Sequence, residues 1–76
     1  MVGSMVVVNA SGGLNVRAGA GLDHNIMFNA DFGAVFEVED GPQQANGLTW
    51  WMIRDPMNSS RFGWAAADYL DVQAAQ

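Results

Sequence analysis

The 76-residue sequence contains no cysteine, no lysine, a single histidine and only two prolines. Without cysteine the chain forms neither a disulfide nor a thiolate metal site, so hydrophobic burial has to hold the fold together. Its apolar runs, such as Met5 to Val8, are far shorter than the roughly 20 residues of a membrane-spanning helix. No basic segment precedes an apolar stretch, as one does in a signal peptide. We therefore expect one small globular domain that does not insert into a membrane.

Positive charge is also scarce, because eight Asp and Glu residues face three Arg residues and give a formal net charge of −5. Proteins that bind nucleic acids or anionic membrane surfaces rely on clustered Lys and Arg side chains. The charge balance therefore predicts no nucleic-acid partner and favours a neutral or cationic one. Half of the residues are hydrophobic (50%), which is typical of a chain with a compact core.

Short apolar stretches separated by turn residues predict an all-β fold. The Asp-Gly-Pro sequence at residues 40–42 is expected to end a strand, and residues 65–70 are long enough for one helical turn. Since closure removes exposed strand edges, a small closed barrel is the expected architecture. The expected strands lie near residues 6–8, 14–17, 26–28, 34–39, 48–54 and 62–64.

Four motifs carry a resemblance to a known family. They are Leu14-Asn15-Val16-Arg17, Gly33 with residues 34–38, Trp50-Trp51-Met52-Ile53-Arg54, and Phe62-Gly63-Trp64 with the closing Tyr69-Leu70. In order and spacing they resemble the bacterial SH3-like (SH3b) domain family, over roughly residues 6–71. The resemblance implies a small five-stranded SH3-like barrel with a short helical turn near the C-terminus. It also implies a targeting or scaffolding module of envelope or secreted proteins, which often binds cell-wall peptide or glycan.

Domain boundaries follow from this alignment of motifs. Residues 1–4 are interpreted as a cloning remnant, residues 5–72 as the SH3b-like barrel domain, and residues 73–76 as a linker or tail. The family resemblance alone favours the cell envelope or the extracellular space as the location.

Residues that enzymes use are sparse in this chain. His24 follows Asp23 in a predicted irregular loop, and neighbours in sequence tend to point in different directions. Glu37 and Glu39 share one strand face, a spacing that is more typical of a solvated surface. No calcium-loop, zinc-protease or phosphate-loop motif is present in the sequence. We therefore predict no catalytic residues, no metal site and no cofactor.

Strand alternation suggests which aromatic side chains face outward. In residues 48–54 it places Trp51 and Ile53 on the inner face and Trp50 on the outer face. An exposed Trp on a small domain is typical of a binding surface. The opposite interpretation, that Trp50 and Tyr69 complete the core, stays open at this point. Three further residues are predicted to have core positions: Phe36, Val38 and Trp64.

The predicted binding site is a shallow aromatic groove for an extended peptide or a cell-wall glycopeptide. Aromatic rings would stack on the ligand, and a carboxylate in the long loop would bind a cationic end. The predicted ligand-binding residues are Trp50, Tyr69, Asp23, His24 and Phe28.

Arg17 and Arg54 are expected to pair with acids across strands.

Two functions from different classes fit these features. The first is a non-catalytic binding or targeting module that uses the groove. The alternative is a structural or self-association domain, a homo-oligomer included, which buries its aromatic face against copies of itself or against neighbouring domains.

Overall fold

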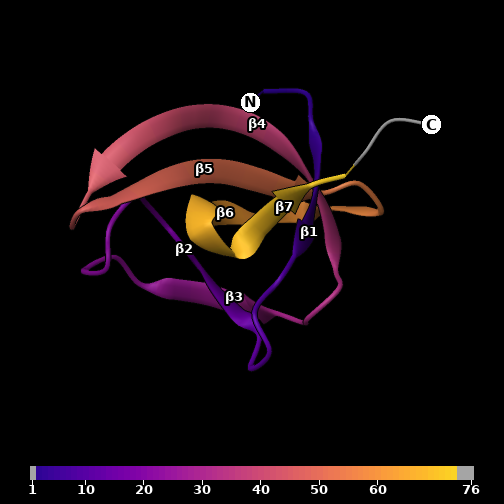
Figure 1. Ribbon diagram of the computed structural model, residues 1–76, viewed down its shortest axis with the longest axis horizontal. Helices are drawn as coiled ribbons and strands as arrows, with labels where there is room; N and C mark the ends of the chain where they lie inside the picture. The colour runs from indigo at the N-terminus through magenta and orange to yellow at the C-terminus, as the bar shows by residue number, and fades with distance from the viewer. Residues whose placement is uncertain (1, 74–76) are drawn as a thin grey trace.

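Seven antiparallel strands and one 3₁₀ turn make up the regular structure of residues 2–73, the part that this computed structural model describes (Figure 1). The all-β prediction is confirmed, and the 3₁₀ turn lies where a helical turn was predicted. No helix within these residues is long and apolar enough to span a membrane. The elements are β1 (Met5–Val8), β2 (Leu14–Arg17), β3 (Ile26–Ala30), β4 (Val35–Ala45), β5 (Leu48–Asp55), β6 (Asn58–Ala66), η1 (Ala67–Tyr69) and β7 (Leu70–Val72).

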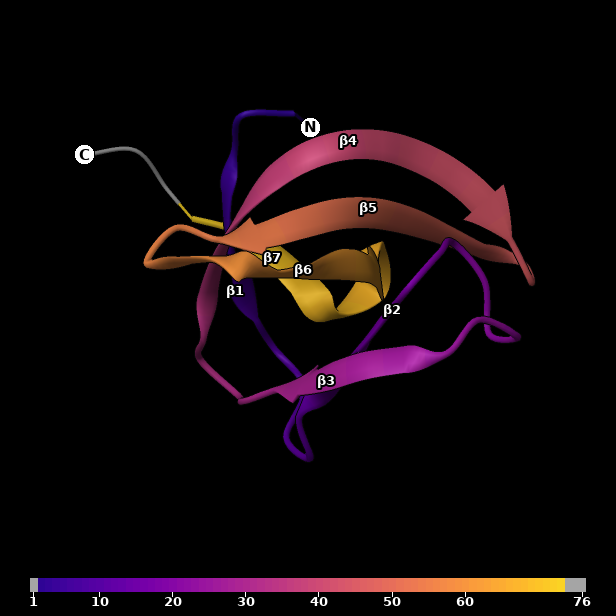
Figure 2. The same ribbon diagram turned by 180° about the vertical axis from the view of Figure 1, so that it is seen from behind.

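The strands form one open sheet in the order β3-β2-β6-β5-β4-β1-β7, so the prediction of a closed barrel was wrong. The sheet curls, with β4 and β5 arching over one side and β3 lying on the opposite side (Figure 2). Its two edges are β3, with five residues, and β7, with three. Short edge strands expose few unpaired backbone groups to another chain. They therefore limit aggregation without closing the barrel. The seven strands exceed the five that the family resemblance implied, and β7, a short strand on β1, is the one that lies outside the six expected ranges.

The Asp-Gly-Pro sequence bends β4 and does not end it, contrary to the prediction. The register between β4 and β5 shifts between Val38 and Asp40 and again between Asp40 and Gln43. Gly41 has a φ of 110°, a backbone conformation that favours glycine. The β4–β5 pairing therefore contains a bulge-like irregularity at these residues, and β4 continues beyond it to Ala45.

Trp50 points inward, so its predicted outward orientation was wrong. Trp50 is 1% exposed and Ile53 is 0% exposed, although they lie three positions apart, while Trp51 is half-buried. A Cβ on Gly41 would lie 3.0 Å from the Trp50 carbonyl oxygen and 3.1 Å from Trp51 Cε3, so β4 approaches closely here. Strict alternation assumes a regular strand, and the irregular pairing opposite Trp50 breaks that assumption.

The main hydrophobic core lies inside the curled sheet. Phe36, Val38 and Ile53 are buried in it, as predicted, and Trp51 packs against it from a half-buried position. Trp64 is only half-buried, so its predicted core position was wrong. Residues from β1, β2, β3, β4, β5, β6 and β7 contribute: Val6, Val8, Leu14, Val16, Ala30, Phe36, Val38, Ile53, Ala65 and Leu70.

The chain ends meet this sheet through backbone hydrogen bonds. The Gly3 N–H donates to the Val38 carbonyl at 2.8 Å, and the Val38 N–H donates to the Ser4 carbonyl at 2.9 Å. The Gln73 N–H donates to the Met5 carbonyl at 2.8 Å. The boundaries of the domain at residues 5–72 stay a prediction. Of the predicted tail, residues 74–76 lie outside the described residues, as does Met1.

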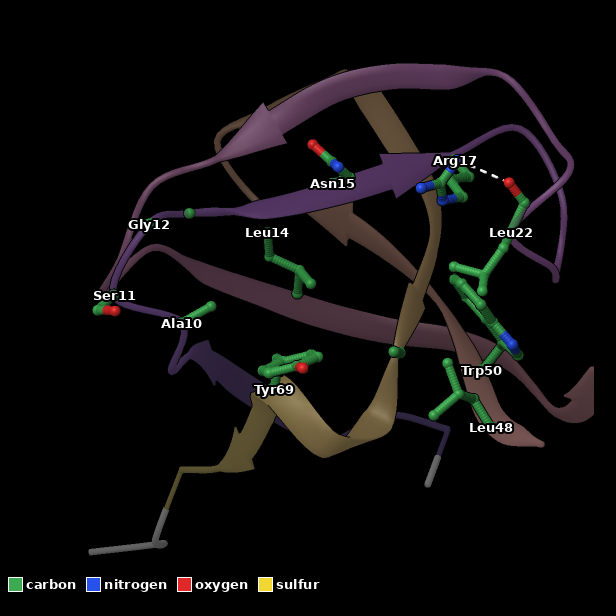
Figure 3. A pocket seen from close by; sticks show the side chains of 12 residues that line it. Ala10, Ser11, Gly12, Leu14, Asn15, Arg17, Leu22, Leu48, Trp50 and Tyr69 are labelled. Atoms are coloured by element: carbon green, nitrogen blue, oxygen red, sulfur yellow. Dashed lines mark hydrogen bonds between the residues drawn. The ribbon is translucent and has the colours of Figure 1, made fainter. Parts of the chain in front are cut away.

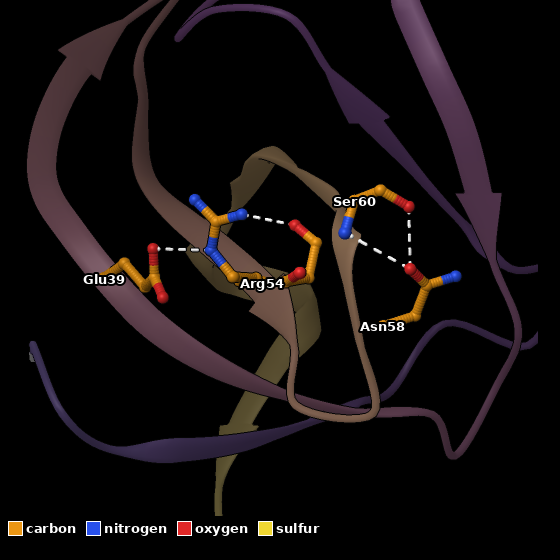
Figure 4. A network of polar contacts seen from close by, with 5 residues as sticks. Glu39, Arg54, Asn58 and Ser60 are labelled. Atoms are coloured by element: carbon orange, nitrogen blue, oxygen red, sulfur yellow. Dashed lines mark hydrogen bonds and ion pairs between the residues drawn. The ribbon is translucent and has the colours of Figure 1, made fainter.

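A polar network joins β4, β5 and β6 on the outer surface (Figure 4). Arg54 Nε lies 2.8 Å from Glu39 Oε1, which confirms the predicted cross-strand pairing of this arginine. Arg54 Nη1 also donates to the Ser59 carbonyl, and its guanidinium lies 4.4 Å from the centre of the Phe62 ring. At the start of β6, the Ser60 hydroxyl donates to Asn58 Oδ1 at 2.7 Å.

Removing this ion pair is expected to have a small effect. The two side chains are 28% and 35% exposed, and exposed pairs contribute at most about 1 kcal/mol. Glu39→Gln should therefore lower the free energy of unfolding by less than about 1 kcal/mol, with a smaller loss at high salt. Urea denaturation at two salt concentrations measures this, and a large, salt-independent loss would contradict it.

Candidate functional site

A groove of about 440 Å³ lies where β2 separates from β6 (Figure 3). The two strands share a single register pair, Arg17 opposite Trp64, so the earlier part of β2 has no partner on that side. The volume falls within the range typical of ligand sites in proteins. The lining residues come from residues 10–13, β2, the following loop, β5 and the end of β6 with η1: Ala10, Ser11, Gly12, Gly13, Leu14, Asn15, Arg17, Leu22, Leu48, Trp50, Ala66 and Tyr69.

The contact between β2 and β6 depends on Gly63. A Cβ at this position would lie 2.6 Å from the Arg17 carbonyl oxygen and 2.7 Å from Val16 Cγ1. A glycine therefore lets the two backbones approach at this point. Because β2 diverges on one side of this contact, Gly63 determines where one end of the groove begins.

Apolar side chains form the floor and walls of the groove. Trp50 forms the floor, and its Nε1–H donates to the Ala45 carbonyl at 2.9 Å. Figure 3 shows Leu22 and Leu48 on either side of the Trp50 ring, and Tyr69 facing Leu14 farther along. Leu22 is 52% exposed and Tyr69 is 47% exposed, so both offer apolar area to a ligand. Large exposed apolar side chains beside a buried ring are typical of a binding surface.

Hydrogen bonds hold the wall that contains Leu22 in place. The Leu22 N–H donates to Asn46 Oδ1 at 2.7 Å, which ties the loop to the turn between β4 and β5. Arg17 Nη1 donates to the carbonyls of Leu22 at 3.1 Å and His24 at 3.0 Å. Arg17 thus bonds backbone carbonyls, and its predicted pairing with an acidic side chain was wrong. The wall is therefore fixed from two sides before any ligand arrives.

The rim of the groove at residues 10–13 presents backbone groups. Gly12 has no side chain, so it lines the groove with main-chain atoms alone. The Gly13 N–H donates to the Ala10 carbonyl at 2.9 Å. Within residues 2–73, the backbone N–H and C=O groups of Ser11 and Gly12 have no hydrogen-bond partner in the protein. The rim therefore offers free donors and acceptors beside an apolar floor.

The structure brings two of the five predicted ligand-binding residues, Trp50 and Tyr69, to this one groove. Asp23 and His24 are exposed but do not line it, and the His24 ring lies against Gly19, where a Cβ would be 2.7 Å from Cε1. The loop places Leu22, which precedes them, on the groove in place of Asp23 and His24. Ligand contact by any of the five residues stays a prediction.

Phe28, the fifth predicted residue, belongs to a different cluster. Its ring centroid lies 6.0 Å from that of Phe36, and the Arg61 guanidinium lies 4.4 Å from the centre of the Phe28 ring. Arg61 Nε is buried without a hydrogen-bond partner, so this cation rests on the aromatic face. Phe28 of β3 therefore packs against the hydrophobic core and does not line the groove.

The sequence alone did not place the ten other lining residues in the groove: Ala10, Ser11, Gly12, Gly13, Leu14, Asn15, Arg17, Leu22, Leu48 and Ala66. Leu22 left one signal, because a lone leucine in a glycine-rich polar loop belongs to no strand pattern. The other groove residues left no signal in the sequence, since their place in the groove depends on where β2 separates from β6. Of the residues that the structure describes, no acidic residue and no histidine lines the groove. No group of three or more His, Asp or Glu side chains in residues 2–73 is arranged to hold a metal ion.

The fold and the groove define a small all-β domain with a preformed surface site. The family model described as the bacterial SH3 domain matches residues 12–71, and the chain belongs to this family. Domains of this family are in general binding or targeting modules and are typically not catalytic. No curated protein and no solved structure gave a significant match to the chain.

Proposed function

We propose that the domain binds an extended peptide segment in the groove between residues 10–13 and Leu22. The peptide is either part of another protein or the peptide part of a cell-wall glycopeptide. The observation that supports this most directly is the presence of free backbone groups at Ser11 and Gly12 beside the apolar floor formed by Trp50. Both kinds of contact are available along one continuous groove.

A peptide needs both kinds of contact. Extended peptides gain affinity from main-chain hydrogen bonds, and they gain specificity from alternate side chains that enter pockets. The Ser11 and Gly12 rim can bond a peptide backbone, while Leu22, Leu48 and Tyr69 can enclose its apolar side chains. A purely apolar small molecule would leave the rim groups unused. A peptide therefore matches the groove better.

The proposed module recognises its partner without catalysing a reaction on it. The acidic charge of the chain supports a partner other than nucleic acid, because phosphates would be repelled. Membership of the bacterial SH3 family supports a place in the cell envelope or outside the cell, where cell-wall peptides are found. Retention by purified cell wall, compared with a cell-wall digest as competitor, tests this location of the ligand.

Tyr69→Ala is expected to weaken peptide binding about tenfold or more with little change in melting temperature. The ring lines the groove but is 47% exposed, so its removal costs the ligand more contacts than it costs the folded chain. Aromatic residues dominate binding energies in this way, and tenfold corresponds to about 1.4 kcal/mol. The probe is a random octapeptide library selected on the immobilised domain, with affinities then measured by calorimetry.

Phe32→Ala is the matched control for this experiment. Phe32 is an exposed aromatic residue (64%) that does not line the groove. Its replacement should leave the affinity unchanged. Equal losses in both variants, or no loss in the Tyr69 variant, would show that the peptide binds elsewhere.

One observation favours self-association as a second function. The edge strand β3 exposes Ile26 (51%) and Met27 (55%), and a free edge with apolar side chains can pair with another copy. Light scattering over a range of concentrations tests this. A mass that stays that of one chain at every concentration would exclude it.

A further inference from the structure

Among residues 2–73, Arg17 is the only charged residue that lines the groove. It ends β2, it is half-buried, and it lies beside Leu22 in Figure 3. The chain as a whole has a net charge of −5, so a cation in the lining contrasts with the rest of the surface. In the part of the chain that the structure describes, the lining holds no carboxylate that would neutralise this cation or repel an anion.

The hydrogen bonds of Arg17 leave one edge of its guanidinium free. Both bonds to backbone carbonyls, those of Leu22 and His24, come from Nη1, which has two N–H groups to donate. Within residues 2–73, Nε and Nη2 donate to no protein acceptor, and no acidic side chain forms an ion pair with Arg17. Arg54 differs, because its Nε is paired with Glu39 at 2.8 Å. Arg17 therefore has full charge and an unused pair of parallel donors.

The free edge has the geometry that carboxylates bind. Nε and Nη2 present two roughly parallel N–H groups, which match the two oxygens of a carboxylate in a bidentate pair. The two carbonyl bonds already fix the guanidinium, so a ligand would lose little side-chain entropy by binding it. Leu22, Leu48 and Trp50, which line the same groove as Arg17, reduce the contact with water and strengthen a charge pair there.

We propose that the peptide recognised by the groove carries a carboxylate, and that Arg17 binds it through Nε and Nη2. The carboxylate belongs either to an Asp or Glu side chain or to the C-terminus of the peptide. This inference rests on the proposed peptide binding. In the resulting arrangement, the peptide backbone meets the rim at Ser11 and Gly12, an apolar side chain packs against Leu22 and Leu48, and the carboxylate lies at Arg17. Arg17 is then the residue that determines specificity.

The experiment begins with two random octapeptide libraries, one with a free C-terminal carboxylate and one with a C-terminal amide. Both are selected on the wild-type domain, and the bound peptides are sequenced. Enrichment of Asp or Glu in both libraries supports a side-chain carboxylate as the ligand. Enrichment of the free-acid library alone supports the C-terminal carboxylate. Binding by peptides of both libraries with no acidic preference overturns the inference and leaves the proposed peptide binding intact.

A double-mutant cycle then assigns the carboxylate to Arg17. The selected peptide is compared with its neutral form, with Gln for Glu, Asn for Asp or the amide for the acid, on the wild-type domain and on Arg17→Met. Neutralisation should weaken binding to the wild type about tenfold or more, and by less than about twofold in the variant. Equal losses in both proteins would overturn the assignment. The comparison of two ligands on one protein cancels any loosening of the loop that follows from the lost carbonyl bonds.

Arg61→Met is the matched control, since it removes the same charge from a residue that does not line the groove. In this variant the neutral peptide should remain about tenfold weaker than the acidic one. If Arg17→Met fails to fold, the two peptides on the wild-type domain still decide whether a carboxylate is recognised. If neither library yields a binder, both the inference and the proposed peptide binding are overturned.

Discussion

Trp50→Ala is expected to lower the free energy of unfolding by about 3–5 kcal/mol, the range for a buried Trp or Phe replaced by Ala. Trp50 is 1% exposed and is the largest of the fully buried side chains. Its loss removes the floor between Leu22, Leu48 and Ala66, and it also removes the hydrogen bond to the Ala45 carbonyl. A small domain without disulfides has only a few kcal/mol of stability. The variant should therefore be largely unfolded.

Circular dichroism during urea and thermal denaturation measures this change. Trp51→Ala is the matched control. The Trp51 ring is half-buried, so its removal should lower the free energy of unfolding by less than the removal of Trp50. Trp50→Phe keeps much of the apolar volume and loses the Nε1 donor, so it should cost less than the alanine variant. An alanine variant with wild-type stability would show that the ring is not part of the fold. Binding in this variant reports on folding, which is why Tyr69 is the better probe of the groove.

Gly63→Ala is expected to lower the free energy of unfolding by about 3 kcal/mol. The added Cβ would lie 2.6 Å from the Arg17 carbonyl oxygen, which is a backbone atom and cannot turn aside as a side-chain end can. Relief of the clash requires β2 and β6 to move apart at the single register pair that joins them. The change therefore affects both stability and the shape of the groove.

Gly12→Ala is the matched control for stability. A Cβ at Gly12 meets nothing within 4 Å, so the same chemical change should have little effect on the free energy of unfolding. Urea denaturation of both variants measures the difference. Hydrogen exchange should also show faster exchange in β2 for the Gly63 variant alone. Similar stabilities for the two variants would contradict the close approach of β2 and β6.

The open sheet and the candidate site have a common origin. Because Arg17 and Trp64 are the single register pair of β2 and β6, the earlier part of β2 and residues 10–13 leave a gap beside the Trp50 ring. A closed barrel would join the earlier part of β2 to β6 by hydrogen bonds. Incomplete closure therefore leaves the space of the groove, beside the free polar groups of the turn at Ser11 and Gly12.

Much of the architecture was predictable from local sequence. Alternation identified the strand of Leu14–Arg17 and the inner positions of Phe36 and Val38, because each depends on a regular stretch of chain. The small 3₁₀ turn was also placed correctly at Ala67–Tyr69. The four sequence motifs, taken in order, identified the family, because their spacing reflects the spacing of strands and turns along the chain.

The site was predictable only in part. The family topology brought Trp50 and Tyr69 together, but it did not predict that Leu22 would face the groove in place of Asp23 and His24. That choice depends on the hydrogen bond from the Leu22 N–H to Asn46, which lies 24 positions away in the sequence. Contacts over such separations leave no periodic signal in a single sequence.

The sequence by itself determined the strands, the acidic charge and the family of this protein, because these follow from neighbouring residues and from composition. Only the tertiary structure decided that the sheet stays open, that Trp50 turns inward and that Arg17 lies in the groove with a free edge. Each of these depends on how separate strands approach one another. β4 lies close to β5 at Trp50, and β6 lies close to β2 at Gly63. Side-chain alternation describes one strand at a time and does not contain that information.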